Sequence, residues 1–172
     1  MPCKRAARIN CKTTAEVRKI DIEFKSDLAA SETISTVDTS SVTPTGVTID
    51  STTISGSKVQ VALSTGITPQ TFTAATDDKL TLNTTDFVDG QTVEIEANGD
   101  ETLPTGLEID TVYYVVSRTG TDVKLAKSSG GDAIDITAAG KGVLFVRHVI
   151  FLKCTTSNAQ TVEGEGILQV RD

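Results

Sequence analysis

Apolar and polar residues alternate in many short stretches of this chain, which is the pattern of half-buried β-strands. The first clear case is residues 16–24, where the apolar residues Ile20, Ile22 and Phe24 alternate with charged ones. Further strands are predicted over residues 32–37, 47–49, 57–64, 79–82, 91–96, 111–116, 123–126 and 133–137. No long stretch has the 3.6-residue period of an amphipathic helix, so the predicted fold class is all-β.

The end of the chain has the signature of a β-hairpin. Two β-rich runs, residues 146–156 and 161–170, flank a short polar turn at residues 157–160. Asn and Ser favour such turns through local side-chain hydrogen bonds. Because a hairpin is not stable alone in water, it must pair with an earlier part of the chain. Gly164 and Gly166 are predicted to mark a bulge or the close approach of another backbone.

A change of composition after Gly66 divides the chain into an outer part and an inserted part. A polar connection and a second set of strands follow Gly66 before the chain returns to the final hairpin. We therefore predict one discontinuous domain over residues 15–66 and 145–172, interrupted by a small β module over residues 67–144. Residues 1–14 are predicted to be a basic N-terminal arm, either frayed or docked on a neighbour.

The charge of the chain narrows the possible partners. Its formal net charge is −7 and its pI is about 4.7, which argues against nucleic acid or an anionic membrane as the main partner. No apolar run approaches the ~20 residues of a membrane helix, and no signal-peptide pattern follows the basic N-terminus. We expect a soluble protein, made in a cytoplasm, that binds neutral or basic protein surfaces.

Residues that usually carry chemistry are few. The three cysteines, Cys3, Cys11 and Cys154, are odd in number and lack zinc-site spacing, so free thiols are expected. His148, the only histidine, has no partner that the sequence can name and is predicted to face solvent. Clustered carboxylates can bind Ca²⁺, but in an acidic chain they usually form a solvated face: Asp77, Asp78, Asp86, Asp89, Asp132 and Asp135. We predict no enzyme activity, no metal and no cofactor.

The basic residues of the N-terminal arm are the candidate interface. They are Lys4, Arg5, Arg8 and Lys12. Such a cluster can contact nucleic acid or protein. Because the rest of the chain is acidic, docking on a protein is favoured.

Several short stretches of the outer domain form a recognisable pattern. They are the strand and turn at residues 20–28 with residues 32–36, the segments 42–49 and 59–64, and the end of the chain at 153–170. On these stretches the outer domain resembles the fibre–tail adaptor proteins of phage virions. In that family a small immunoglobulin-like sandwich ends in a turn rich in Thr, Ser and Gly before its last strand. Here the sequence Thr155-Thr156-Ser157-Asn158-Ala159-Gln160-Thr161 occupies that place.

Residues 67–144 are extra relative to that family and are similar to a module found in other phage structural proteins. This second resemblance rests on residues 87–93, 103–107, 111–116 and 123–137. Together the two resemblances imply an immunoglobulin-like β-sandwich interrupted by a small β-barrel-like module. They also imply a structural component of a tailed-phage virion, assembled in the cytoplasm of the bacterial host.

The role that the resemblance implies is an adaptor, present in several copies, that attaches tail fibres or neighbouring proteins at the tail or the head–tail junction. Its partners would then be fibre, tail, portal or other adaptor proteins, with no membrane. A capsid decoration protein is an alternative. A carbohydrate-binding module is a further one because β-sandwiches often have that function. It would need exposed aromatic rings, and the chain has no Trp and only two Tyr, Tyr113 and Tyr114.

Overall fold

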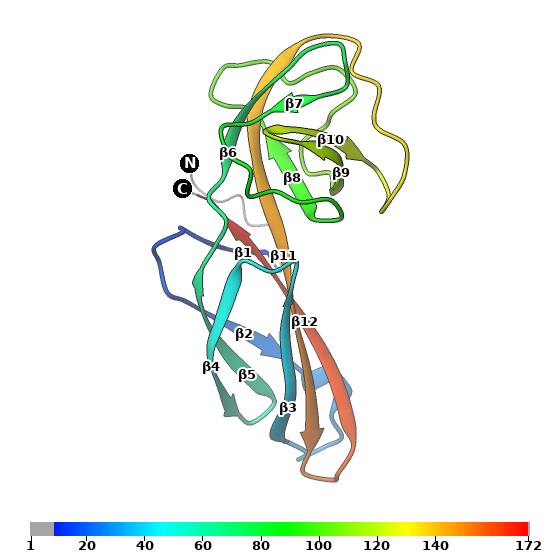
Figure 1. Ribbon diagram of the computed structural model, residues 1–172. Helices are drawn as coiled ribbons and strands as arrows, with labels where there is room; N and C mark the ends of the chain where they lie inside the picture. The colour runs from blue at the N-terminus through cyan, green and yellow to red at the C-terminus, as the bar shows by residue number, and fades with distance from the viewer. Residues whose placement is uncertain (1–8, 172) are drawn as a thin grey trace. The chain divides into compact units, whose positions relative to one another are not determined.

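The computed structural model describes residues 9–171 and consists almost entirely of strands and loops (Figure 1). Over this range the regular elements are the strands β1 to β12 and one 3₁₀ turn, η1 (Lys25–Asp27), so the all-β prediction is confirmed. The chain forms two compact units. Unit 1 contains the described residues up to Gly66 and those from His148 onward, and unit 2 is Ile67–Arg147.

Unit 1 contains two β-sheets, labelled in Figure 1. The strand order of the first sheet is β1 (Ile9–Lys12), β12 (Thr161–Val170), β11 (Gly140–Thr156) and β3 (Ile34–Thr43). The order of the second is β2 (Arg18–Glu23), β5 (Lys58–Thr65) and β4 (Val47–Ser55). β1 runs parallel to β12, whereas β3 is antiparallel to β11, and β2 and β4 are antiparallel to β5.

Side chains from both sheets of unit 1 share one core, because alternate residues of each strand point to the same face. The predicted alternation at Ile20, Ile22 and Phe24 is confirmed, since all three are buried. Their buried partners on the other strands are Ile34, Val47, Val59, Val61, Leu63, Ile150, Leu152, Cys154, Leu168 and Val170. Full burial of one such aliphatic side chain contributes about 1.5–3 kcal/mol, so this shared core is what holds the two sheets together.

The two glycines of β12 leave room for the side chains of β2. A Cβ atom added at Gly164 would lie 2.6 Å from Cε1 of Phe24, which no real structure tolerates without a shift. One added at Gly166 would lie 3.2 Å from Cδ1 of Ile20. The sequence predicted a bulge or the approach of another backbone at these glycines. The atoms that approach are instead core side chains of β2 and of Phe24, which follows it.

The strands of unit 2 pair in a closed cycle. Residues of β11 before Arg147 pair on one side with β6 (Gln70–Ala74) and on the other with β8 (Thr92–Glu96). The cycle continues from β6 through β7 (Leu80–Thr81), β10 (Asp122–Ala126) and β9 (Tyr113–Thr119) back to β8. Each strand of unit 2 therefore has two antiparallel neighbours.

The β9–β10 hairpin supplies much of the core of unit 2. Leu125 pairs with Val115 and Lys124 with Val116, and Tyr113, Val115 and Leu125 are buried. The Tyr113 hydroxyl accepts a hydrogen bond from the N–H of Glu108 at 2.8 Å and lies 3.3 Å from its carbonyl oxygen. The enclosed phenol is thus satisfied by the backbone, as a buried Tyr requires.

Three segments differ from the sequence prediction. Residues 9–12 form β1, although they were included in the predicted arm, and residues 70–74 form β6 where a connection was expected. Residues 133–137 were predicted to be a strand but form none. Ile136 in that loop is nevertheless buried, and its N–H donates to Asp78 Oδ1 at 2.9 Å. The N–H of Ile134 donates to the carbonyl of Leu125 in β10 at 2.8 Å, so one backbone bond and one side-chain acceptor hold this loop in place.

Candidate functional site

Lys12 is the only predicted interface residue within the described range, since Lys4, Arg5 and Arg8 lie outside it. Its side chain is buried, with 2% of the residue exposed. The Nζ atom donates to the carbonyl oxygens of Thr13 at 2.6 Å, Thr14 at 3.3 Å, and Thr65. These contacts hold the Lys12 ammonium within unit 1, and a role of Lys12 in an interface stays a prediction.

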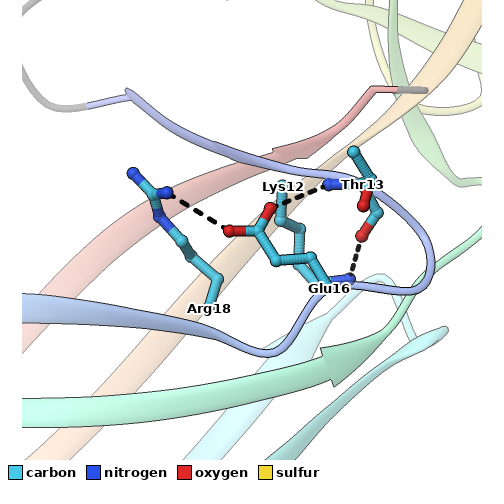
Figure 2. A network of polar contacts seen from close by, with 4 residues as sticks. All are labelled: Lys12, Thr13, Glu16 and Arg18. Carbon is cyan, nitrogen blue, oxygen red and sulfur yellow. Dashed lines mark hydrogen bonds and ion pairs between the residues drawn. The ribbon is translucent and has the colours of Figure 1, made fainter.

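The turn after β1 is fixed by Glu16. Figure 2 shows its carboxylate between the N–H of Thr13, at 3.2 Å, and Nη1 of Arg18, at 3.3 Å. The N–H of Glu16 in turn donates to the Thr13 carbonyl at 3.2 Å. The polar groups that join β1 to β2 are thus paired within the turn. From Ile9 onward the N-terminal strand is part of the fold, and any arm must precede it.

β1 is also anchored at its Lys12 end by Arg171, which follows the C-terminal strand. The carbonyl of Lys12 accepts from the N–H of Arg171 at 2.8 Å, and Nε of Arg171 donates to Oε1 of Gln169 at 2.9 Å. Cys11 of the same strand is disulfide-bonded, so the expectation of a free thiol is wrong there. Cys154 is a free, buried thiol, as expected, and burial raises its pKa.

His148 is fully enclosed in unit 1, so the prediction that it faces solvent is wrong. It lies two residues before Ile150 and therefore on the core face of β11. Its Nδ1 is 2.8 Å from the carbonyl oxygen of Pro44. Because a carbonyl can only accept, Nδ1 carries the proton and Nε2 is the bare nitrogen. Over residues 9–171, Nε2 is buried without a hydrogen-bond partner.

The electrostatic surroundings keep the imidazole of His148 neutral. Burial lowers its pKa below 6.5, the hydrogen bond to Pro44 opposes this shift, and the positive charge of Lys12 adds to it. A general base needs a reacting group within hydrogen-bond reach, but the one contact of this ring is a backbone carbonyl. The residue therefore has a structural role. The alternation that leads to Ile150, Leu152 and Cys154 could have placed it in the core.

The candidate metal-binding carboxylates are used in ordinary polar contacts. Asp77 pairs with Lys79 at 3.2 Å and Asp78 with Lys124 at 3.8 Å. Asp89 Oδ1 accepts from the N–H of Arg118 at 2.9 Å. In the part of the chain that the structure describes, no three His, Cys, Asp or Glu side chains gather where they could hold a metal ion. These carboxylates instead fix loops of unit 2.

A shallow, open hollow lies in each unit. The hollow in unit 1 has a volume of about 510 Å³ and contains Lys58 and Glu23, whose Nζ and Oε2 atoms are 3.9 Å apart. The hollow in unit 2 has a volume of about 290 Å³ and contains the Lys141–Glu101 ion pair at 3.2 Å. Its one aromatic residue, Phe72, is buried. Neither hollow therefore presents the exposed aromatic ring that a carbohydrate platform uses.

The described range also has no apolar helix of membrane-spanning length.

Within residues 9–171, the strands at the margins of the sheets lie in unit 1. They include β3 in the first sheet and β2 and β4 in the second, whereas the pairing of unit 2 closes on itself. An outer strand carries unpaired N–H and C=O groups to which another chain can add a strand. The geometry of unit 1 thus favours binding to an extended segment of protein.

A comparison with known families gives a match over part of the chain. Residues 12–86 match the family described as podophage GP4 fiber-tail adaptor protein gp77. The match confirms the predicted resemblance to phage fibre–tail adaptors and indicates a structural component of the virion tail. No curated protein and no solved structure gives a significant match.

The matched range differs from the segments on which the predicted resemblance rested. It covers less than half of the 172 residues and continues past Gly66 into β6 and β7 of unit 2. It does not include the final hairpin of β11 and β12. The likeness to the family therefore resides in β2 to β7 and the loops that connect them.

Proposed function

We propose that this protein is a non-enzymatic adaptor that attaches tail fibres or neighbouring proteins at the tail or the head–tail junction of a tailed phage. The observation that carries the proposal is the family match over residues 12–86. The free edges of unit 1 support it, because they suit attachment through protein interfaces. In this role the protein is present in several copies, and its partners are other virion proteins.

We also propose that unit 1 is immunoglobulin-like and unit 2 barrel-like. In immunoglobulin domains one sheet contains strands B, E and D and the other C, F and G. The order β2-β5-β4 corresponds to B-E-D, and β3-β11-β12 to C-F-G. Unit 2 then occupies the connection between E and F. Its closed cycle of strand pairs supports the barrel-like description.

The proposed attachment uses two parts of the chain. One is the set of strand edges of unit 1, and the other is the N-terminal segment, defined here as residues 1–8. This segment carries Lys4, Arg5 and Arg8 and no acidic residue, whereas the chain as a whole has a charge of −7. An acidic body with a basic end can bind the acidic face of a neighbouring copy or of another virion protein.

A truncation limited to the N-terminal segment tests this role. Removing residues 2–8 spares β1, whereas a cut through Lys12 would delete that strand and its anchoring contacts. The cut also removes Cys3 while Cys11 is disulfide-bonded, so Cys11→Ser in the full chain is the matched control. We expect the truncated protein to keep the thermal unfolding curve of that control but to be incorporated into particles at reduced copy number. Full occupancy would show that the segment is dispensable.

A map of the assembled particle tests the location. Density for this protein at the tail or the portal supports an adaptor. Density on capsomer faces, away from the tail, would replace the adaptor with the alternative of a capsid decoration protein.

A further inference from the structure

An exposed turn of unit 2 carries an asparagine directly before a glycine. The turn is Asn98-Gly99-Asp100-Glu101, shortly after β8, and its first three residues are exposed. The N–H of Glu101 donates to the carbonyl oxygen of Asn98 at 3.3 Å, which is the closing bond of a β-turn. Gly99 has a φ of 66°, a left-handed conformation that glycine adopts without steric cost. Asparagine is a thermolabile residue, so its surroundings in this turn matter.

The deamidation of an asparagine needs two atoms of adjacent residues to meet. The backbone nitrogen of the following residue attacks Cγ of the side-chain amide. Its N–H must therefore be free, and the side-chain amide must be able to turn toward it. A following glycine favours this approach, because it has no Cβ atom and its backbone rotates easily.

The structure meets these conditions at Asn98. A Cβ atom added at Gly99 would meet no atom within 4 Å, so the space around the attacking nitrogen is open. In the described part of the chain, no hydrogen bond holds the side-chain amide of Asn98 or the N–H of Gly99. Both reacting groups are therefore exposed and unrestrained.

The other three asparagines lack this freedom. Asn10 lies within β1, and its side chain donates to a carbonyl of β12 at 3.4 Å. Asn83 donates to a threonine hydroxyl at 3.5 Å and is followed by Thr84, whose branched Cβ crowds the backbone nitrogen. After Asn158, the N–H of Ala159 already donates to a backbone carbonyl at 3.0 Å.

The pair Asp89-Gly90 shows how the same fold protects a similar sequence. An aspartate before a glycine can close the same ring with loss of water. Here the N–H of Gly90 donates to the carbonyl oxygen of Val115 at 2.8 Å, and Oδ1 of Asp89 accepts from the N–H of Arg118 at 2.9 Å. The sequence offers both pairs, and the hydrogen bonds of the fold distinguish them.

We propose that Asn98 is a modification site, which spontaneous deamidation converts to aspartate and isoaspartate in the folded protein. A bond forms between the nitrogen of Gly99 and Cγ of Asn98, and the C–N bond of the side-chain amide breaks. The departing ammonia takes up the proton of the Gly99 N–H. Water then opens the five-membered ring. Cleavage at Cγ gives aspartate, and cleavage at the backbone carbonyl carbon of residue 98 gives isoaspartate.

The product changes both the charge and the backbone of the turn. Either form adds a negative charge in the hollow that contains the Lys141–Glu101 ion pair. Isoaspartate also inserts a methylene group into the backbone, which displaces the acceptor of the Glu101 N–H. The same loop is held to β11 by the N–H of Lys141, which donates to the carbonyl of Thr102 at 3.0 Å. We therefore expect residues 97–102 to loosen.

Peptide mapping of the full chain tests the proposal. The folded protein is incubated at neutral pH in water enriched in the heavy oxygen isotope, then digested by an acid protease in ordinary water. We expect heavy oxygen in the peptide that contains residue 98. Its conversion should exceed that of Asn10, Asn83 and Asn158 in the same sample several-fold. These three residues are internal controls, so no variant has to fold. Hydrogen exchange of residues 97–102 should be faster in the isoaspartate form.

The chain unfolded in urea supplies the second comparison. Asn98 should convert in both states, whereas isoaspartate at Asp89 should form only in the unfolded chain. Gly99→Ala should slow the conversion of Asn98 several-fold, and an unchanged rate would overturn the role given to Gly99. Conversion of Asn98 in the unfolded chain alone, or at the rate of the other three asparagines in the folded chain, would overturn the proposal.

Discussion

The Nδ1 atom of His148 lies 2.8 Å from the carbonyl oxygen of Pro44, and this contact joins β11 to the turn between β3 and β4. The other ring nitrogen is enclosed and, over residues 9–171, has no hydrogen-bond partner. Protonation would therefore create an unpaired charge in the core, close to the ammonium of Lys12. Unit 1 should be sensitive to acid through this one residue.

The sign of the effect follows from the lowered pKa of His148. The unfolded chain titrates near the ordinary value of 6.5, so below that pH it binds more protons than the folded chain. The contribution of neutral His148 to the free energy of unfolding is therefore fully present above about pH 6.5, and it decreases as the pH is lowered below that value. Glu32 and Asp38 also have lowered pKa values, but they start from 4.5 and 3.8 and act at lower pH.

We expect the urea midpoint of unit 1 to decrease when the pH is lowered from about 7.5 to about 5.5. The variant His148→Phe should lose most of this pH dependence. Hydrogen exchange of peptides from residues 148–156 is a suitable measurement, because Tyr113 and Tyr114 report only on unit 2. An unchanged pH slope in the variant would mean that another group is responsible.

Two adjacent valines of β9 test the register of unit 2. Val115 is fully buried opposite Leu125, whereas Val116 is half-buried opposite Lys124. Val115→Asp places an unpaired charge in the core and should lower the free energy of unfolding by about 3 kcal/mol. Val116→Asp should lower it by about 1 kcal/mol or less. Thermal unfolding followed by Tyr fluorescence distinguishes the two. Similar losses for both would reject this register.

The sequence predicted strands well where alternate residues are strongly apolar, as at Ile20, Ile22 and Phe24. It missed β6, because Phe72 is the only large apolar residue among its five. It also ended β3 at residue 37, although the strand continues to Thr43. The residues after 37 are mostly Ser and Thr on an outer strand, and no apolar stripe marks them. These strands are defined by the strands with which they pair. The local pattern of apolar and polar residues carries no information about those partners.

The candidate interface was predictable only in part, for a similar reason. Lys12 belongs to the same basic stretch of sequence as Arg8, yet its ammonium donates to the carbonyl of Thr65, which is 53 residues away in the sequence. β1 itself exists through parallel pairing with β12 at the other end of the chain. No local signal distinguishes a lysine of an arm from a lysine of such a strand.

Replacement of Gly164 tests the packing between β12 and β2. Because a Cβ atom there would lie 2.6 Å from the ring of Phe24, Gly164→Ala should destabilise unit 1 by about 1–3 kcal/mol through overpacking. Gly166→Ala, with its nearest contact at 3.2 Å, should cost less. Combining Gly164→Ala with Phe24→Leu should recover part of the loss in a urea titration. Additive losses in the double variant would show that the two side chains do not compete for the same space.

Removal of unit 2 tests whether unit 1 is an independent domain. The two cores share no residue: that of unit 1 is built from strands before Gly66 and after Arg147, and that of unit 2 from residues between them. In unit 1, β5 ends at Thr65 in one sheet and the chain resumes at His148 in the other. Facing sheets lie about 10 Å apart, a distance that six Gly/Ser residues can span.

A chain that lacks Ile67–Arg147, joined through such a linker, should therefore unfold cooperatively in urea. Val61, which is fully buried in unit 1, provides the control: Val61→Asp in the shortened chain should abolish the transition, because an unpaired charge would then occupy its only core. A shortened chain without a cooperative transition would mean that unit 1 depends on unit 2 for its stability. In that case the family match, which spans both units up to Asp86, would describe one inseparable fold.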